Sequence, residues 1–347
     1  MNQLRMIAWE ITRQCNLSCV HCRASAQKGP YLNELTTDEC LGLLDNIVSF
    51  STPVVILTGG EPLLRRDIFQ IARHGTEKGL RLVMAVNGTL VDENMARKMQ
   101  DAGIQRISVS IDGATAESHD RFRQVSGAFE GALCGMRSAK KVGLEFQINT
   151  TITRQNSHEL PNILDLAIDL GAAAHHVFLL VPTGRGKDLS DQQVTAQEYE
   201  EILTWLYDQM ERSPLHLKAT CAPQFYRILR QKARQDGKSV TYQNFGLDAT
   251  TRGCLGGVSF CFISNVGQVQ PCGFLELNCG NVRESTLERI WTNSPIFRDL
   301  RDFNNYRGRC GRCEYRKVCG GCRARAYEMS GDFLEEEPYC AYEPRYS

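Results

Sequence analysis

The sequence lacks an excess of charge of either sign. Forty Lys and Arg side chains balance 40 Asp and Glu side chains, whereas nucleic-acid-binding proteins usually show a basic excess or stripe. No apolar run approaches the roughly 20 residues that a membrane-spanning helix needs. The N-terminus also lacks the charged-then-apolar order of a signal peptide. We therefore expect no nucleic-acid partner, no membrane span and a cytoplasmic location.

Cysteine, by contrast, is abundant. The chain has 15 cysteines in 347 residues, and several lie in C-x2-C units. An odd total clustered in this way argues against the disulfide framework of a secreted protein, which leaves iron-sulfur or zinc ligation. The length is sufficient for a barrel-sized domain and a second module.

The first cysteine group follows the apolar run Met6–Trp9, so a strand would place it on a loop at its C-terminal end. Cys15, Cys19 and Cys22 have C-x3-C-x2-C spacing. Three thiolates can hold three irons of a [4Fe-4S] cluster, in which each iron is normally held by one cysteine. The fourth iron is then open to a ligand, as a catalytic zinc keeps one position free. A zinc clip or a chance cluster is the alternative.

A second motif, Thr58-Gly59-Gly60-Glu61-Pro62, stands where the next predicted strand should end. Two glycines allow close approach of backbone to a ligand, and a carboxylate suits an ammonium group. The two motifs, in this order and at this separation, resemble the radical S-adenosylmethionine (SAM) superfamily. The resemblance implies an enzyme in which Cys15, Cys19 and Cys22 hold the catalytic cluster and SAM chelates the open iron. It implies SAM contacts at Gly59, Gly60, Glu61, Ser110 and Arg123.

Short apolar or β-branched runs alternate with amphipathic stretches from Leu4 to about Asp236, as in strand-helix units around a parallel sheet. The predicted strands are 5–10, 54–57, 82–86, 106–111, 145–152 and 176–181. Six units fit an α/β fold, a partial (β/α)6 radical SAM barrel, and such sheets bind ligands at the C-terminal ends of strands. We expect a barrel over 1–236, a linker over 237–250 and a cysteine-rich domain over 251–347.

Polar residues follow three more of these strands. They are Asn87-Gly88-Thr89, Asp112-Gly113 after Ser110, and Asn149-Thr150-Thr151. If the strands are parallel, these residues point into one mouth. The alternative is that Asn-Gly and Asp-Gly are ordinary turn dipeptides.

The last hundred residues are Gly-rich, with nine cysteines from Cys254 onward. Such a segment buries too little carbon to order itself, so metal ligation must supply stability. Its pattern resembles the SPASM extension of radical SAM enzymes, which implies two auxiliary [4Fe-4S] clusters. By that resemblance the outer cluster is held by Cys310, Cys313, Cys319 and Cys340. The inner cluster is held by Cys254, Cys261, Cys272 and Cys322.

Two features depart from that pattern. The closing C-x3-C unit is here C-x2-C, and Gly273 stands where sulfatase-maturing relatives carry an aspartate base. Zinc is the alternative ligand for this module, because C-x2-C pairs also bind zinc. The remaining cysteines, for which a buried apolar role is expected, are Cys40, Cys134, Cys221 and Cys279.

Nearly the whole chain resembles the heme b synthases of the siroheme-dependent heme pathway, in stretches 4–10, 174–187, 217–223 and 251–257. The resemblance implies oxidative decarboxylation of two propionates of Fe-coproporphyrin III to the vinyl groups of heme b. It also implies a small electron donor such as ferredoxin or flavodoxin. The alternatives are a related enzyme acting on siroheme-derived side chains (a decarboxylase or a heme d1 biosynthetic enzyme), a peptide-modifying maturase, and a non-catalytic iron-sulfur carrier.

A substrate with four carboxylates needs cations near the mouth. The candidates are Arg185, Lys187, Lys218, Arg227 and Arg252. Adjacent residues on a strand face opposite ways, so only one of His175 and His176 can face into the barrel. That histidine is expected to contact the porphyrin iron or a propionate; a core histidine with one hydrogen-bond partner is the alternative.

Overall fold

The computed structural model describes residues 3–345 and contains a single ten-stranded sheet in the order β10-β9-β8-β1-β2-β3-β4-β5-β6-β7. All pairs from β8 to β7 along this order are parallel, and β9 pairs antiparallel with both β8 and β10. The strands are β1 Met6–Thr12, β2 Val54–Gly59, β3 Arg81–Val86, β4 Ile104–Ser110, β5 Glu145–Ile152, β6 Ala174–Leu179, β7 His216–Thr220, β8 Phe260–Ile263, β9 Gln268–Gln270 and β10 Gly280–Asn281.

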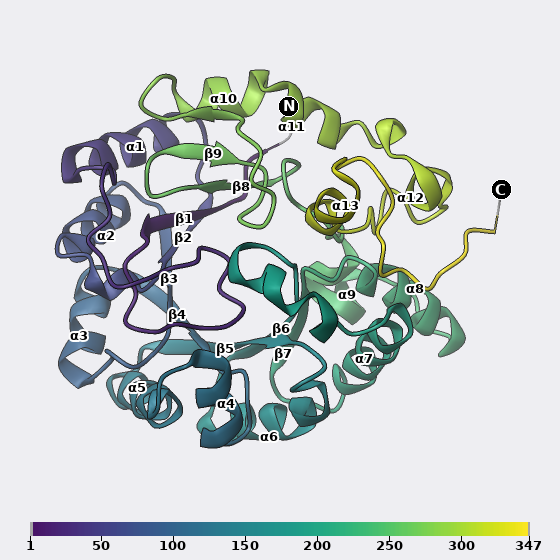
Figure 1. Ribbon diagram of the computed structural model, residues 1–347, viewed down its shortest axis with the longest axis horizontal. Helices are drawn as coiled ribbons and strands as arrows, with labels where there is room; N and C mark the ends of the chain where they lie inside the picture. The colour runs from purple at the N-terminus through teal and green to yellow at the C-terminus, as the bar shows by residue number, and fades with distance from the viewer. Residues whose placement is uncertain (1–2, 346–347) are drawn as a thin grey trace.

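Helices cover the outer side of this sheet, which curves into an open barrel (Figure 1). Those between the barrel strands are α1 Thr37–Phe50, α2 Ile68–Glu77, α3 Glu93–Asp101, α4 Ala116–Arg123, α5 Ala128–Val142, α6 Leu160–Leu170 and α7 Ala196–Gln209. After β7 come α8 Phe225–Gln235, α9 Tyr242–Phe245, α10 Leu287–Asn293, α11 Pro295–Arg301, α12 Gly308–Arg312 and α13 Arg323–Ser330.

Side-chain alternation along the strands separates an apolar helix-facing side from a polar inner side. In β1, Ile7, Trp9 and Ile11 are buried in the main apolar core. Glu10 lies between two of them and is also fully buried, so it points to the other face of the sheet. The same alternation recurs on the neighbouring strands. The core therefore sits between sheet and helices, and polar groups line the inside of the curve.

All six predicted strands are present, and a capping box formed by Thr36 and Glu39 begins α1. Three features were not predicted. β7 adds a seventh parallel strand, α4 follows β4, and β8 of the cysteine-rich region pairs with β1. β7 has only five residues, two of them His216 and Lys218, so its apolar pattern was too weak to identify it. Among residues 3–345, no helix is both long enough and apolar enough to cross a bilayer.

Candidate active site and metal centres

The first three thiols lie together on the loop after β1, which crosses the inside of the curved sheet (Figure 1). Cys15 and Cys19 are buried in a small apolar cluster, and Cys22 packs against it. The loop closes on itself, because the Cys15 N–H donates to the Gln27 carbonyl at 3.0 Å. Three thiols are thus held at one end of the barrel on a short, closed loop.

Each of these sulfurs accepts one hydrogen bond. The N–H groups of Leu17 and Ala26 donate to the sulfurs of Cys15 and Cys22, each at 3.4 Å. The Arg123 guanidinium donates to the sulfur of Cys19. Burial raises the pKa of Cys15 to about 11, so iron binding must displace its proton. Donors aimed at sulfur favour the thiolate that iron requires, and the loop therefore fits an iron-sulfur cluster.

The Gly-Gly-Glu motif lies directly against the thiol loop. A Cβ on Gly60 would lie 2.3 Å from the carbonyl oxygen of Gln14, so only glycine fits there. Glu61 is fully buried, and its carboxylate accepts the N–H groups of Asn87 at 2.8 Å and Leu63 at 3.1 Å. Burial raises its pKa to about 7, against the two hydrogen bonds, which lower it. The motif thus joins the thiol loop to the ends of β2 and β3.

Arg123, at the end of α4, connects the thiol loop to the end of β4. Its guanidinium forms a buried ion pair with Asp112, and Nη1 donates to the sulfur of Cys19 at 3.5 Å. Burial lowers the pKa of Arg123, but Asp112 and Cys19 outweigh it and leave that pKa raised. A fixed positive charge thus lies beside the second thiol. Ser110 ends β4 on the inner side of the sheet.

Arg185, predicted as a substrate clamp, holds the thiol loop in this structure. Its Nε donates to the Cys19 carbonyl and its Nη1 to the Ala26 carbonyl, both at 2.8 Å. Its own N–H donates to the Cys22 carbonyl at 3.0 Å. A Cβ on the preceding Gly184 would lie 2.1 Å from the Arg23 carbonyl oxygen, so the backbone there also follows the loop closely.

A row of polar side chains crosses the inner face of the sheet. Strand register places Ser110 beside Asn149, Asn149 beside His176, and His176 beside Lys218. His176 Nδ1 lies 3.0 Å from Nε2 of Gln147. Burial, first of all, and then Lys218 lower the pKa of His176. His176 is therefore neutral, with Nε2 carrying the proton when Gln147 donates to Nδ1.

The other predicted substrate contacts lie away from this row. His175 faces the helix layer and shares a 2.9 Å hydrogen bond with Thr150. Lys187 is mostly exposed and pairs with Glu328 at 2.9 Å. Arg252 and Arg227 lie in or beside the C-terminal region, where they stack on Phe303 and Tyr342. Arg227 is also paired with Glu200.

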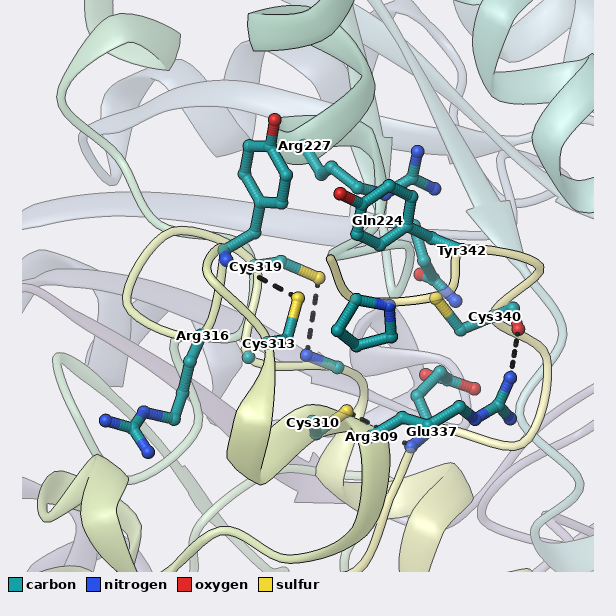
Figure 2. Close-up of a pocket in the computed structure, with 14 residues that line it drawn as sticks. Gln224, Arg227, Arg309, Cys310, Cys313, Arg316, Cys319, Glu337, Cys340 and Tyr342 are labelled. Atoms are coloured by element: carbon teal, nitrogen blue, oxygen red, sulfur yellow. Dashed lines mark hydrogen bonds between the residues drawn. The ribbon is translucent and has the colours of Figure 1, made fainter. Parts of the chain in front are cut away.

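The four thiols predicted for the outer cluster line one pocket (Figure 2). Burial raises the pKa of Cys340 to about 11, while the N–H groups of Gly321, Tyr315 and Glu337 donate to three of the sulfurs. The lining thiols are Cys310, Cys313, Cys319 and Cys340.

The predicted inner set is brought together only in part. Cys272 packs against a second small cluster that contains buried Cys322, and the segment after Cys254 lies against Cys272, since a Cβ on Gly256 would lie 3.4 Å from Cys272 Cβ. Cys261 is elsewhere: it is fully buried in the main core, beside Cys279. Cys221, predicted to have only a buried apolar role, packs in the cluster with Cys272 and Cys322.

The position of Cys261 follows from strand parity. Cys261 lies on β8, in register with Ile7 of β1, and it shares the helix-facing side of the sheet with Ile7. Cysteine spacing does not show which side of the sheet each side chain of β8 faces. Only the register of β8 with β1 shows this. Within residues 3–345, no three His, Cys, Asp or Glu side chains are placed to hold a single metal ion. The cluster assignments therefore rest on how the thiols are grouped.

Comparisons with known proteins agree with this architecture. Residues 9–167 match the radical SAM superfamily, and residues 254–323 match SPASM, an iron-sulfur cluster-binding domain. The crystal structure of Streptococcus suis SuiB bound to S-adenosylmethionine has a TM-score of 0.78 at 16% identity, covering 98% of this chain and 78% of SuiB. Fold and matches together define a radical SAM enzyme with a SPASM domain, a class that uses [4Fe-4S] clusters and SAM.

Sequence relatives narrow the class. The chain is 55% identical to the AdoMet-dependent heme synthase of Nitratidesulfovibrio vulgaris over 98% of this chain and 93% of that protein. It is 31% identical to the Fe-coproporphyrin III synthase of Methanosarcina barkeri, over 96% of this chain and 87% of that protein. The chain belongs to the family of AdoMet-dependent heme synthases.

Proposed function

We propose that this enzyme converts two propionates of Fe-coproporphyrin III into the vinyl groups of heme b. The observation that carries the proposal is the 55% identity to a heme synthase along almost all of both chains. The identity falls to 31% for a relative named for making Fe-coproporphyrin III, so the resemblance favours consuming that porphyrin over producing it.

The thiol loop would hold the catalytic cluster through Cys15, Cys19 and Cys22. Such a cluster, together with SAM, would supply the one-electron chemistry needed to remove a hydrogen atom from a propionate side chain. Arg123 beside Cys19 supplies a positive charge for the SAM carboxylate, and Glu61 supplies a negative charge for its amino group. Burial of the loop excludes water from the reacting atoms.

The chemistry of decarboxylation agrees with the residue at Gly273. Each propionate loses one hydrogen atom, carbon dioxide and one electron, so no strong base is required. A Cβ at Gly273 would lie 3.0 Å from Phe262 Cδ2 and 3.3 Å from Arg23 Cδ. A side chain long enough to act as a base would therefore be crowded at position 273. The electron released by decarboxylation can pass to an auxiliary cluster.

The inner polar row is the proposed substrate contact. His176 with its proton on Nε2 can donate to a propionate, and Lys218 beside it supplies a cation. The proposed role of Arg185 is to position the thiol loop. The physiological electron donor is proposed to be a ferredoxin or a flavodoxin.

The test is anaerobic incubation of cluster-loaded enzyme with SAM, a reductant and Fe-coproporphyrin III, followed by pigment analysis. We expect monovinyl and then divinyl products together with 5'-deoxyadenosine. Deoxyadenosine without any change in this pigment, but with a change in a siroheme-derived porphyrin, would contradict the proposal and assign the enzyme to that substrate.

A further inference from the structure

Cys221 has an unusual backbone and an unexpected position. It follows β7 directly, at the C-terminal end of the last barrel strand. Its φ is +54°, a left-handed conformation that residues other than glycine adopt rarely and that tends to persist at functional sites. Cys221 packs against a small cluster formed by Val181 of the barrel domain and by Leu275, Cys322 and Ala324 of the C-terminal domain.

We propose that Cys221 is the fourth protein ligand of the inner iron-sulfur cluster, in the place expected for Cys261. The barrel would then supply one ligand, and the C-terminal domain would supply Cys254, Cys272 and Cys322. This inference rests on the proposed presence of an inner cluster, but not on the identity of the porphyrin substrate.

The packing of the three segments brings the four thiols together. Cys221 and Cys272 both pack on the cluster that contains buried Cys322. A Cβ on Gly256 would lie 3.4 Å from Cys272 Cβ, which places the segment after Cys254 against Cys272. The Cys254 N–H donates to the Cys319 carbonyl at 3.2 Å, so Cys254 runs beside the segment that leads to Cys322.

Cys221 itself is tied to the segment before Cys254. A Cβ on Gly253 would lie 2.5 Å from Cβ of Pro223, so the turn after Cys221 fits against this glycine. Cys254 follows Gly253 directly, so the segments that carry Cys221 and Cys254 lie side by side.

Cys261 has the opposite surroundings. Its side chain faces the helix layer, and its electrostatic neighbours are Cys279 and Arg301. The next residue, Phe262, faces the other way, where Arg23 stacks on its ring at 4.5 Å. Turning Cys261 toward Cys272 would shift β8 by one residue and move every side chain of that strand to the wrong face.

A fourth thiolate has a functional consequence. A [4Fe-4S] cluster with four cysteine ligands has no open iron, so it can accept an electron but cannot bind a substrate directly. Arg23 follows Cys22 on the thiol loop, and a Cβ on Gly273, the residue after Cys272, would lie 3.3 Å from its Cδ. The inner cluster would therefore lie beside the catalytic loop, where the electron from the propionate is released.

The test measures iron in a reference protein that carries Cys15→Ala, Cys19→Ala and Cys22→Ala, so that only auxiliary clusters remain. We expect about eight irons per chain in this reference. Adding Cys221→Ala leaves three thiolates on the inner cluster, so a chelator should remove about four of these irons faster than from the reference, whereas Cys261→Ala should lose iron at the reference rate. Equal rates of iron loss from the reference and the Cys221→Ala protein, or faster loss from Cys261→Ala, would overturn the proposal.

A second measurement covers the case in which Cys221→Ala does not fold. Cys221→Ser keeps the shape of the side chain and offers an oxygen ligand. We expect its reduced cluster to show a shifted electron paramagnetic resonance (EPR) signal, and Cys261→Ser to show the reference signal. An unshifted signal in Cys221→Ser would overturn the proposal. Porphyrin turnover is not measured, so failure of the proposed reaction leaves both readouts unaffected.

Discussion

The role of Arg185 gives the sharpest prediction, because a loop support and a substrate clamp respond differently to the same substitution. Arg185→Met keeps most of the side-chain volume but removes the donors to the Cys19 and Ala26 carbonyls. Hydrogen bonds involving a charged group contribute about 1.5–3 kcal/mol each. We therefore expect the thiol loop to lose about 3 kcal/mol or more of local stability.

That loss should appear as weaker retention of the catalytic cluster. A loss of about 3 kcal/mol corresponds to roughly a hundredfold change in a loop-opening equilibrium. We expect a chelator to remove iron from Arg185→Met about a hundredfold faster than from the wild type, when both contain the catalytic cluster. Lys187→Met is the matched control, because Lys187 is mostly exposed and pairs only with Glu328 among the described residues. If Arg185→Met lost iron at the wild-type rate but bound the porphyrin more weakly, Arg185 would be a substrate contact and would not support the loop.

Three further predictions concern the sites around the loop. Gly60→Ala should abolish SAM binding measured by calorimetry, because the added Cβ would lie 2.3 Å from the carbonyl oxygen of Gln14. Gly42→Ala is the control and should bind SAM normally, because there is open space around Gly42. The pKa of Glu61 in the folded protein is raised from 4.5 to about 7, so the folded state binds the proton more tightly and the free energy of unfolding falls as pH rises between these values. Glu61→Gln should remove this part of the fall, measured as the unfolding temperature against pH. An unchanged slope of unfolding temperature against pH in Glu61→Gln would contradict this prediction. Lys218→Met should raise the KM for the porphyrin about tenfold and leave SAM binding unchanged; an unaltered KM would exclude Lys218 from the site.

The sequence by itself was enough to predict the chemistry and the repeating fold. Cysteine spacing and the Gly-Gly-Glu motif are local patterns, and the ligands they predict on the thiol loop lie within eight residues of one another. Alternating apolar periodicity is also local, which is why all six predicted strands and the α1 capping box are present. The outer thiols likewise reach one pocket, since three of them lie within a ten-residue segment.

Tertiary structure alone decided which distant thiols and cations meet. The face of β8 depends on its register with β1, so cysteine spacing could not exclude Cys261. Cys221 reaches the inner group because β7, a strand without a clear apolar pattern, ends beside the C-terminal domain. Arg185 belongs to the thiol loop because two carbonyls 159 and 166 residues earlier accept its hydrogen bonds. Such contacts join segments far apart in the chain, and only the packing of the folded protein determines them.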